Sequence, residues 1–217
     1  MDQNEKKRAA ARAASEHLSD GIVLGIGTGS TVDLFIDEIA NQRDRFESVV
    51  SSSTRSTEKL RDLGFDVKEL NRVGSMDLYI DGADEATKHK HLIKGGGGAL
   101  TREKILAGAA RKFVCIVDDT KLVGKLGAFP LPIEVIPMAR SFVSRQMVKA
   151  GGQPQWREGF VSDNGNDIID VHNLNIMNPV ELEARFNQIP GIVTVGIFAD
   201  RPADVLLVAS ESGVRSI

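Results

Sequence analysis

Short apolar runs alternate with helical patterns along the first half of the chain. The apolar runs have the length of buried strands and lie at residues 22–26, 49–50, 65–70, 76–80 and 113–117. Helical patterns cover residues 3–18, 32–40 and 101–112, and another helix begins in the hydroxyl-rich segment 51–54. This alternation predicts an α/β fold, in which a mainly parallel sheet carries helices on both faces.

The order of predicted strands and helices changes after segment 129–132, which contains two prolines. From there the pattern reads strand, helix, strand, strand, helix, strand, at residues 133–136, 137–149, 153–157, 167–171, 179–189 and 192–198. Asn164-Gly165, between the two middle strands, is a strong hairpin-turn signal. Because this order is the split βαβ pattern, we predict a small α+β, ferredoxin-like domain at 129–199. Residues 1–128 and 200–217 form the larger predicted domain, to which a strand at 204–209 returns.

Composition and charge narrow the classes of function. The chain has 217 residues, a formal net charge of -3 and one cysteine, Cys115, in an apolar run. This charge gives no sign of a nucleic-acid or polybasic membrane surface. A single cysteine allows no intrachain disulfide, which suits a reducing compartment. No segment is typical of a membrane span or a signal peptide, so we expect a soluble cytoplasmic protein.

A glycine- and hydroxyl-rich loop, residues 25–31, follows the first predicted strand. It fails as a dinucleotide fingerprint, because Ser30 or Val32 stands where the third glycine is required, and it lacks the lysine of a Walker loop. A strand–loop–helix junction with exposed backbone N–H groups is a good seat for a monophosphate. An ordinary capped turn has the same composition, so both interpretations stay open at this point.

Two acids follow the strand predicted at 76–80. Asp81 lies at its carboxyl end, where open α/β sheets place ligands, and Gly82 lets the chain turn so that Asp84 can face the same crevice. The alternative is a turn whose aspartates cap backbone N–H groups. The four glycines at 95–98 lose much conformational entropy when they become ordered. Their presence therefore favours a backbone that must pack closely against other groups, and a flexible loop tip is the less favoured interpretation.

Lys94 and Glu103 flank these glycines and complete a set of acid–base groups. Glu103 falls in the first turn of the following helix, where the helix dipole favours the ionised form that accepts a proton. Lys94 can offset charge that develops on a substrate oxygen. Taken alone, Glu103 is more typical of a surface residue. His89 and His91 form an isolated His-x-His pair without a third ligand, so no metal site is expected.

Several motifs together resemble ribose-5-phosphate isomerase of type A. They are Gly-Thr-Gly-Ser-Thr at 27–31, Ser-Ser-Ser at 51–53, Asp-Gly-Ala-Asp-Glu at 81–85, Lys-Gly-Gly-Gly-Gly-Ala-Leu-Thr-Arg-Glu-Lys at 94–104, Phe-Pro-Leu-Pro-Ile-Glu-Val-Ile-Pro at 129–137 and Asp-Asn-Gly-Asn at 163–166. The resemblance covers essentially the whole chain, and Arg55-Ser56 departs from it without touching a catalytic position. It implies a Rossmann-like sheet domain that carries a small α+β domain, commonly as a homodimer.

The resemblance also implies a reaction. It is the interconversion of ribose 5-phosphate and ribulose 5-phosphate in the pentose phosphate pathway, without a metal or an organic cofactor. Glu103 would shuttle a proton between C1 and C2 through an enediolate, and Lys94 would steady the developing oxyanion. Asp81 and Asp84 would assist ring opening and hydroxyl proton movements. The implied substrate-binding residues are Thr28, Gly29, Ser30, Thr31, Asp81, Gly82, Ala83, Asp84, Lys94, Gly95, Gly96, Gly97 and Lys121.

Two other functions fit parts of the pattern. An acyl-CoA transferase on a related fold would use Glu103 as its nucleophile, but such enzymes usually need more surface for the CoA nucleotide. A non-catalytic sugar-phosphate sensor would not need the full set of acids and lysine, and residues 1–18 are too short for a helix-turn-helix unit. The sequence also leaves open whether Lys6 or Lys7 reaches the phosphate of the substrate.

Overall fold

The computed structural model describes every residue from Met1 to Ile217. The chain divides into two compact units. Unit 1 contains Met1–Ala83, Arg102–Leu122 and Ala203–Ile217, and unit 2 contains Asp84–Thr101 and Val123–Pro202. This division differs from the predicted domains in grouping residues 84–101, 123–128 and 200–202 with the second unit.

Unit 1 is built on a six-stranded sheet with the order β13-β12-β6-β3-β1-β2. Its strands are β1 Val23–Ile26, β2 Ser48–Ser51, β3 Met76–Asp81, β6 Ala110–Asp118, β12 Val205–Ser210 and β13 Gly213–Ser216. Neighbouring strands pair in parallel except for β12 and β13, which are antiparallel. The predicted α/β fold is confirmed, and the last predicted strand does return to this sheet, beside β6.

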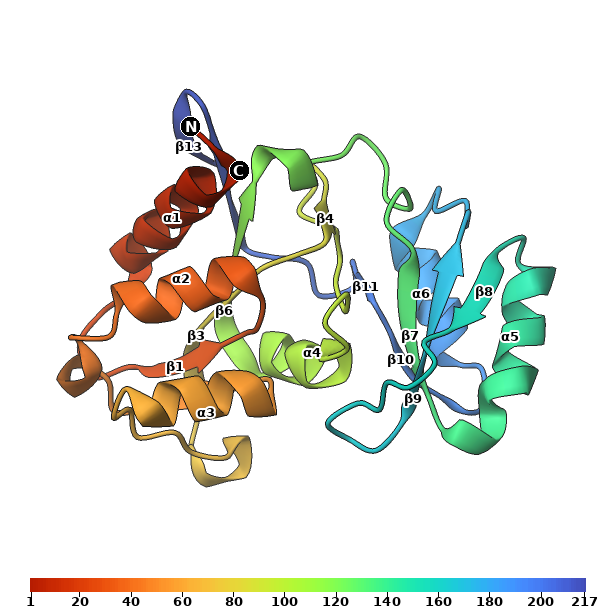
Figure 1. Cartoon of the computed structure of the whole chain (residues 1–217), viewed down its shortest axis with the longest axis horizontal. Coiled ribbons are helices and arrows are strands. Elements are labelled where there is room, and N and C mark those ends of the chain that lie inside the picture. The colour runs from red at the N-terminus through yellow and green to blue at the C-terminus, as the bar shows by residue number, and fades with distance from the viewer. The chain divides into compact units, whose positions relative to one another are not determined.

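Helices cover both faces of this sheet. They are α1 Gln3–Ala14, α2 Ser30–Glu38, α3 Thr54–Asp62 and α4 Leu100–Ala109. In Figure 1, α1 and α2 lie on one side of the strands and α3 and α4 on the other. Phe35 of α2, Leu60 of α3 and Ile80 of β3 belong to one buried apolar cluster, so the sheet and its helical layers share a core.

The strand order reverses at β1, which has β2 on one side and β3 on the other. In open α/β sheets such a reversal opens a crevice outside the carboxyl ends of the strands. The segments that leave this edge are residues 27–29 after β1, 82–83 after β3 and 119–121 after β6. The fold of unit 1 therefore brings three distant candidate segments to the same edge of one sheet.

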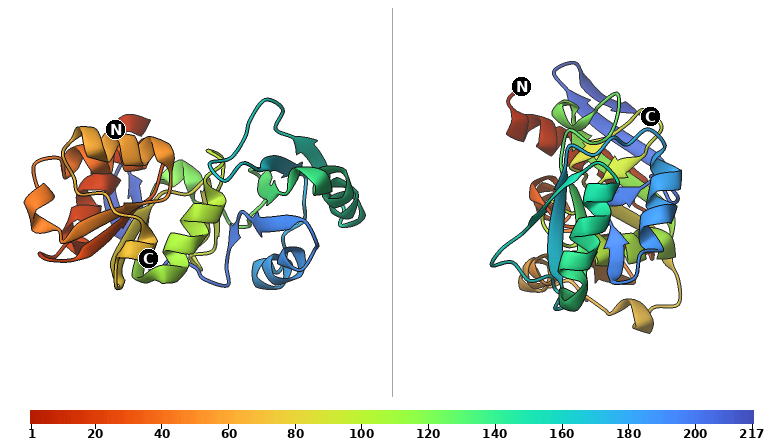
Figure 2. Two further views of the ribbon diagram at one scale, coloured as in Figure 1. Left: turned by 90° about the horizontal axis from the view of Figure 1, so that it is seen from below. Right: turned by 90° about the vertical axis from the view of Figure 1, so that its right-hand side faces the viewer.

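Unit 2 contains a four-stranded antiparallel sheet with the order β10-β7-β9-β8. Its elements are β7 Leu131–Val135, α5 Arg140–Lys149, β8 Gln153–Trp156, β9 Asp167–His172, α6 Pro179–Asn187 and β10 Ile192–Val195. Met147 of α5 and Phe186 of α6 share a buried apolar cluster with the sheet, and Figure 2 shows the two helices side by side. The element order and the sheet order agree with the predicted split βαβ arrangement.

Smaller elements complete the fold. A three-stranded sheet of unit 2 has the order β11-β5-β4, with β4 Glu85–Ala86, β5 Leu92–Ile93 and β11 Ile197–Phe198. Short 3-10 helices lie at Ser15–His17, Arg43–Arg45, Leu70–Arg72, Asp119–Lys121 and Pro137–Ala139. None of the helices combines the length and the apolar character needed to cross a lipid bilayer.

The structure corrects several predicted strands. Residues 65–70 make a single bridge to the sheet, between Val67 and Val49, and then enter a 3-10 helix. The strand predicted at 192–198 is divided at Gly196 into β10 and β11, which belong to different sheets. A Cβ at Gly196 would lie closest to the carbonyl oxygen of Lys94 and 2.9 Å from that of Pro132, so the backbone is closely packed where the chain passes from one sheet to the other. β13 was not predicted, because its exposed residues lack an apolar alternation.

Candidate active site

The glycine- and hydroxyl-rich loop joins β1 to the first turn of α2. The N–H of Gly27 donates to the carbonyl of Ile80 at 2.9 Å, which ties the start of the loop to β3. α2 begins at Ser30, and its N-cap residue Gly29, at φ 116°, offers no side chain to accept from the first-turn N–H groups. Those N–H groups and the positive end of the helix dipole are the kind of groups that bind anions, and they lie at the carboxyl edge of the sheet.

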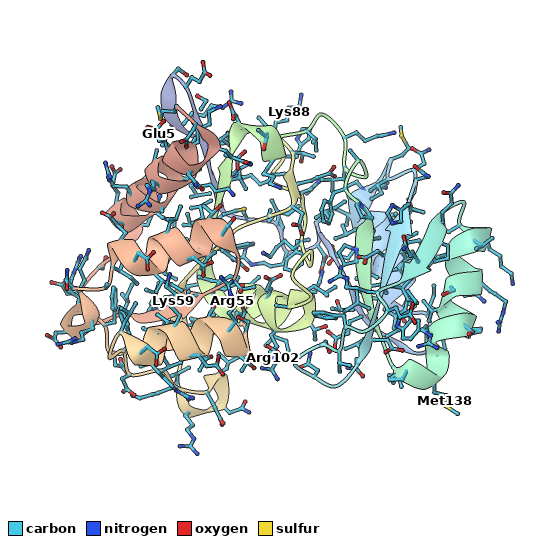
Figure 3. All side chains as sticks on the ribbon, in the orientation of Figure 1. Glu5, Arg55, Lys59, Lys88, Arg102 and Met138 are labelled. Atoms are coloured by element: carbon cyan, nitrogen blue, oxygen red, sulfur yellow. The ribbon has the colours of Figure 1, made fainter.

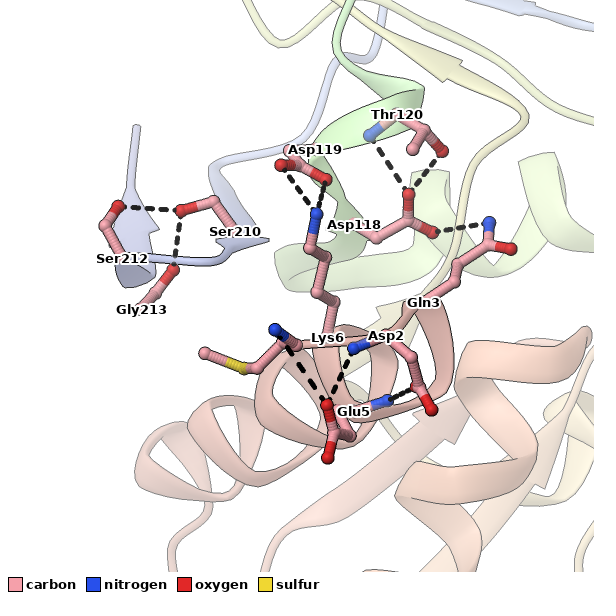
Figure 4. Close-up of polar contacts among 11 residues, drawn as sticks. Asp2, Gln3, Glu5, Lys6, Asp118, Asp119, Thr120, Ser210, Ser212 and Gly213 are labelled. Atoms are coloured by element: carbon pink, nitrogen blue, oxygen red, sulfur yellow. Dashed lines mark hydrogen bonds and ion pairs between the residues drawn. The ribbon is translucent and has the colours of Figure 1, made fainter.

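Two neighbouring lysines of α1 have different partners. Lys7 Nζ lies 2.9 Å from Ser30 Oγ, so this lysine reaches the first residue of α2. Lys6 Nζ instead donates to both carboxylate oxygens of Asp119, at 3.0 and 3.1 Å (Figure 4). The hydrogen bond that Lys6 donates to Asp119 raises the pKa of Lys6, against a smaller opposite effect of burial. Of the two lysines that the sequence left open, Lys7 is the one placed at the candidate phosphate loop.

Further cations link α2 to α3 behind this loop. Arg55 pairs with Asp33, and Lys59 pairs with Asp37 at 2.7 Å; Figure 3 shows both cations lying between the two helices. Lys59 also donates to the carbonyl of Asp33 at 2.8 Å. Arg55, which belongs to the Arg55-Ser56 departure from the family pattern, therefore joins α3 to α2, the helix that follows the loop.

Asp81 is the most enclosed of the predicted site residues, with no exposed surface. Its Oδ1 accepts hydrogen bonds from the N–H of Gly82 at 2.7 Å and from the N–H of Thr28 at 3.2 Å. Its Oδ2 accepts from the hydroxyl of Tyr79, two residues earlier on β3. A buried carboxylate needs such donors, and here they connect the end of β3 to the loop after β1.

Tyr79 was not identified from the sequence, where it reads as one apolar residue of a buried strand. Burial, then the negative charges of Asp81 and Glu103 and the hydrogen bond to Asp81, raise the pKa of Tyr79 well above its ordinary value, against an opposite effect of Ser52. The phenol therefore stays protonated and donates. Because Glu103 influences this pKa, the side chains of Tyr79, Asp81 and Glu103 form one electrostatic cluster in unit 1.

Glu103 lies in the first turn of α4 and is only 3% exposed. Taken alone, its sequence position was more typical of a solvated surface residue, so its burial could not be read from the pattern. The partial positive charge of the first helical turn favours the carboxylate form. Lys121 ends the 3-10 helix that follows β6, where Asp118 accepts from the N–H of Thr120 at 3.0 Å. Lys121 thus stands at the same sheet edge as Asp81.

In unit 2, Asp84 and Lys94 are held by the small sheet β11-β5-β4. Asp84 donates its N–H to the carbonyl of Ile93 at 2.8 Å, and its Oδ2 accepts from the N–H of Gly96 at 2.8 Å. Lys94 is 2% exposed and donates its N–H to the carbonyl of Gly196 at 2.9 Å. Its ammonium lies 5.7 Å from the ring centroid of Phe198. The side chain of Asp84 is therefore tied to the glycine run, and Lys94 is held through its backbone, with its ammonium near a ring of the same unit.

Close packing accounts for most of the glycine run. Gly95 and Gly98 have φ values of 105° and 80°, which only glycine adopts easily. A Cβ at Gly96 would lie 2.6 Å from Asp84 Oδ1, whereas one at Gly97 would meet nothing within 4 Å. The sequence prediction of a closely packed backbone thus holds for three of these positions, and Gly97 has no steric requirement.

Arg157 fixes the same run from the other side of the loop. Its guanidinium donates to the carbonyls of Gly95 and Gly96, at 3.3 and 3.2 Å, and forms a salt bridge of 2.6 Å with Asp170 of β9. The polypeptide around Lys94 is therefore rigidly held, which suits a residue that must present a charge at a defined position.

A buried carboxylate on β7, Glu134, organises the segment before Glu103. It has no exposed surface and accepts from the hydroxyls of Thr101 and Ser162 and from the amides of Asn164 and Asn166. This network explains the Asp-Asn-Gly-Asn motif at 163–166 as a structural feature of unit 2. The only signal in the sequence was an acid at a core position of a predicted strand.

The predicted site residues are thus distributed over the two units. Unit 1 carries Thr28, Gly29, Ser30, Thr31, Asp81, Gly82, Ala83, Glu103 and Lys121, and unit 2 carries Asp84, Lys94, Gly95, Gly96 and Gly97. His89 and His91 lie with their ring centroids 6.1 Å apart, and no group of three or more histidine, cysteine, aspartate or glutamate side chains is arranged to hold a metal ion.

Comparison with known proteins gives consistent matches. Residues 48–213 match the family model of ribose 5-phosphate isomerase A, also called phosphoriboisomerase A. The chain is 59% identical over 210 residues to ribose-5-phosphate isomerase A of Francisella tularensis subsp. novicida (strain U112), covering 97% of this chain and 94% of that protein.

Solved structures agree with this match. The crystal structure of ribose 5-phosphate isomerase A from Neisseria gonorrhoeae superimposes with a TM-score of 0.97 at 46% identity, covering 99% of this chain and 96% of that one. A D-ribose-5-phosphate isomerase in complex with phospho-erythronic acid gives a TM-score of 0.95 at 35% identity, covering 100% and 99% of the two chains.

Proposed function

Because the chain belongs to the ribose 5-phosphate isomerase A family and is an enzyme that interconverts ribose 5-phosphate and ribulose 5-phosphate, we propose that Glu103 is the base of this reaction. The observation that carries the proposal is the position of this carboxylate, which is 3% exposed in the first turn of α4. The partial positive charge at a helix N-terminus favours the ionised form of a carboxylate, which is the form that accepts a proton as a general base.

One base is sufficient for this chemistry. An aldose and its ketose differ by one proton, which moves from C2 to C1, and by a carbonyl, which moves the other way. A single carboxylate above the plane of a cis-enediolate reaches both carbons. A positioned acid–base group contributes about 10²–10⁴ in rate, and a preorganised partner for the oxyanion adds on the order of 10²–10³. We assign that second role to Lys94, which unit 2 holds in a fixed position.

The phosphate of the sugar is proposed to bind at the first turn of α2. The backbone N–H groups of Ser30 and Thr31, the Lys7 ammonium beside Ser30 Oγ and the Lys121 ammonium supply donors and positive charge. The backbone N–H of Thr28 donates to Asp81, so this N–H holds the conformation of the loop. Anchoring the phosphate holds C1 and C2 in register with the base, which is the orientation contribution to the rate.

Asp81 and Asp84 are proposed to assist ring opening and hydroxyl proton movements. Asp81 is surrounded by hydrogen-bond donors in unit 1, and Asp84 accepts a hydrogen bond from the N–H of Gly96 in unit 2. The solved relative holds phospho-erythronic acid, which carries a phosphate and a carboxylate on a short chain. We propose that this compound inhibits the present chain by occupying the sugar-phosphate site.

The test of Glu103 is the variant Glu103→Gln, assayed for ketose formation from ribose 5-phosphate labelled with deuterium at C2. The wild-type protein is expected to form ribulose 5-phosphate and to release part of the label to water. The variant should bind ribose 5-phosphate with nearly unchanged affinity, because the amide keeps the shape of the side chain, and should lose nearly all turnover. Retention of a tenth or more of the wild-type kcat would refute the assignment of the base.

We further propose that the protein acts in the cytoplasm and as a homodimer. The single buried cysteine is compatible with a reducing compartment. Light scattering of the purified protein measures the mass in solution, and a mass of one chain, 23.5 kDa, would contradict the dimer.

A further inference from the structure

We propose that Tyr79 is a positioning residue of the isomerase reaction, which orients the carboxylate of Asp81 and, through it, the start of the phosphate loop. The inference rests on the proposed function of this site. It concerns a residue that neither the motifs nor the family resemblance singled out.

The geometry of β3 places the two side chains together. Tyr79 and Asp81 are two residues apart on one strand, so both point to the same face of the sheet. Neither has exposed surface, and the phenol hydroxyl donates to Asp81 Oδ2. Asp81 Oδ1 accepts the N–H groups of Gly82 and Thr28, at 2.7 and 3.2 Å. With Oδ2 engaged by the phenol, Oδ1 is turned toward these two backbone groups.

Strand β1, which lies beside β3, and the loop that follows it have glycines where they face Tyr79 and Asp81. Gly25 of β1 stands opposite Tyr79 in the sheet, and a Cβ there would lie 2.9 Å from Tyr79 Cδ2 and 2.5 Å from Met76 Sδ. A Cβ at Gly27 would lie 2.5 Å from Asp81 Oδ2 and would overlap other atoms of the same carboxyl group. Gly25 in β1 and Gly27, two residues later, thus leave room for Tyr79 and for Asp81, respectively. On the other neighbouring strand, the ring of Phe113 packs on Tyr79 with 5.1 Å between centroids.

The phenol suits this role because it donates without changing charge. Its pKa is raised well above the ordinary value by burial and by the charges of Asp81 and Glu103, so it stays protonated wherever the enzyme works. The phenol therefore remains the donor, and Asp81 the acceptor, while protons are transferred to and from the neighbouring acids. A hydrogen bond to a charged acceptor is stronger and more directional than one between neutral groups.

The test is a double-mutant cycle with Tyr79→Phe and Asp81→Asn. Phenylalanine keeps the ring that packs on Phe113 and removes only the hydroxyl. We expect Tyr79→Phe to lower kcat/KM by about ten- to a hundredfold, the range for a lost hydrogen bond to a charged group. If Tyr79 acts through Asp81, the double variant should be no worse than Asp81→Asn within about twofold.

A second measurement does not depend on turnover. Backbone amide exchange of Thr28 and Gly82 should accelerate in Tyr79→Phe, because their acceptor is no longer held. Ser162→Ala is the matched control, since it also removes a buried hydroxyl that donates to a buried carboxylate, Glu134, in unit 2. It should leave these two amides unchanged.

Two results would overturn the proposal. One is a Tyr79→Phe enzyme with unchanged kcat/KM and unchanged exchange, which would reduce the residue to ring packing. The other is a loss that adds fully to that of Asp81→Asn, which would separate Tyr79 from Asp81. The cycle compares rates whichever residue is the base, so a failure of the Glu103 assignment is detected separately by Glu103→Gln.

Discussion

Replacing Gly27 by alanine tests how unit 1 positions Asp81. An ideal Cβ at Gly27 would lie 2.5 Å from Asp81 Oδ2 and closer still to Cγ and Oδ1. Asp81 has no exposed surface and is held by Tyr79, Gly82 and Thr28. The added methyl can therefore be accommodated only if the carboxylate moves and breaks some of these hydrogen bonds.

The cost follows from two contributions. Overpacking of a buried site costs about 1–3 kcal/mol. Each hydrogen bond to a charged group contributes about 1.5–3 kcal/mol, and partial loss of this set adds a similar amount. We expect Gly27→Ala to lower the free energy of unfolding by about 3–5 kcal/mol, a large part of the roughly 5–15 kcal/mol of a typical protein. Activity should fall with it, because the start of the phosphate loop moves.

Urea denaturation followed by far-UV circular dichroism measures this change. Tryptophan fluorescence is less suitable, because the single tryptophan, Trp156, lies in unit 2. Gly108→Ala is the matched control: Gly108 lies in α4, and a Cβ there meets nothing within 4 Å. That variant should be stabilised by about 0.5–1 kcal/mol through helix propensity, with activity unchanged.

A rescue separates the mechanism from general damage. In the Asp81→Ala background the atoms that collide with the new methyl are gone, so Gly27→Ala should cost much less there. If Gly27→Ala is destabilised by less than about 1 kcal/mol in the wild-type background, below even a minimal overpacking cost, the close approach of Gly27 and Asp81 is not as described. An equal cost in both backgrounds would likewise refute the reasoning.

Two further predictions use other parts of the site. The chain has one tyrosine, Tyr79, whose pKa is raised, so its absorbance near 295 nm should not show the phenolate until well above the ordinary pKa of about 10, whereas guanidinium-unfolded protein should titrate near that value. Because the folded state holds this proton more tightly, the contribution to stability is complete below about pH 10 and declines as pH rises from there toward the folded pKa; stability that rises across this range would contradict the sign. Gly96→Ala places a Cβ 2.6 Å from Asp84 Oδ1 on an exposed turn. We expect a loss of kcat of about tenfold or more, as a small misplacement of a reacting group produces, with little change in melting temperature; Gly97→Ala, which meets nothing, is the control, and equal losses in both would count against a role for Asp84.

The order of elements was predictable because it depends on local patterns. Apolar runs bounded by glycine and helical patterns with caps placed most strands and helices within a few residues of their observed bounds. The errors occurred where pairing depends on distant residues. Residues 65–70 are as apolar as a strand but meet only Val49 at the sheet edge, and residues 192–198 change sheets at Gly196.

The candidate site was predictable in part. The positions of Asp81 and of the loop at 27–31 followed from the rule that parallel sheets place ligands at the carboxyl ends of their strands. Proton acceptance by Glu103 and charge compensation by Lys94 were inferred from their positions beside the glycine run, and the specific reaction steps assigned to Asp84, Lys94 and Glu103 came from the resemblance; all of these roles stay predictions. Tyr79 and Glu134 were missed, because a hydroxyl or an acid inside an apolar strand gives no sign of its partner until the chain is folded.

The sequence by itself determined the class of fold, the succession of elements and the family, since these are written in periodicity and in motifs that are contiguous along the chain. Only the tertiary structure decided which polar groups are buried and which glycines are needed. The missing side chain of Gly27 leaves room for Asp81, and Asp81 accepts hydrogen bonds from Tyr79 and Thr28. Glu134 likewise accepts hydrogen bonds from both Thr101 and Ser162, which are far apart in the sequence. The physical reason is that burying a charge requires donors from several segments at once, and their meeting depends on the packing of the whole unit.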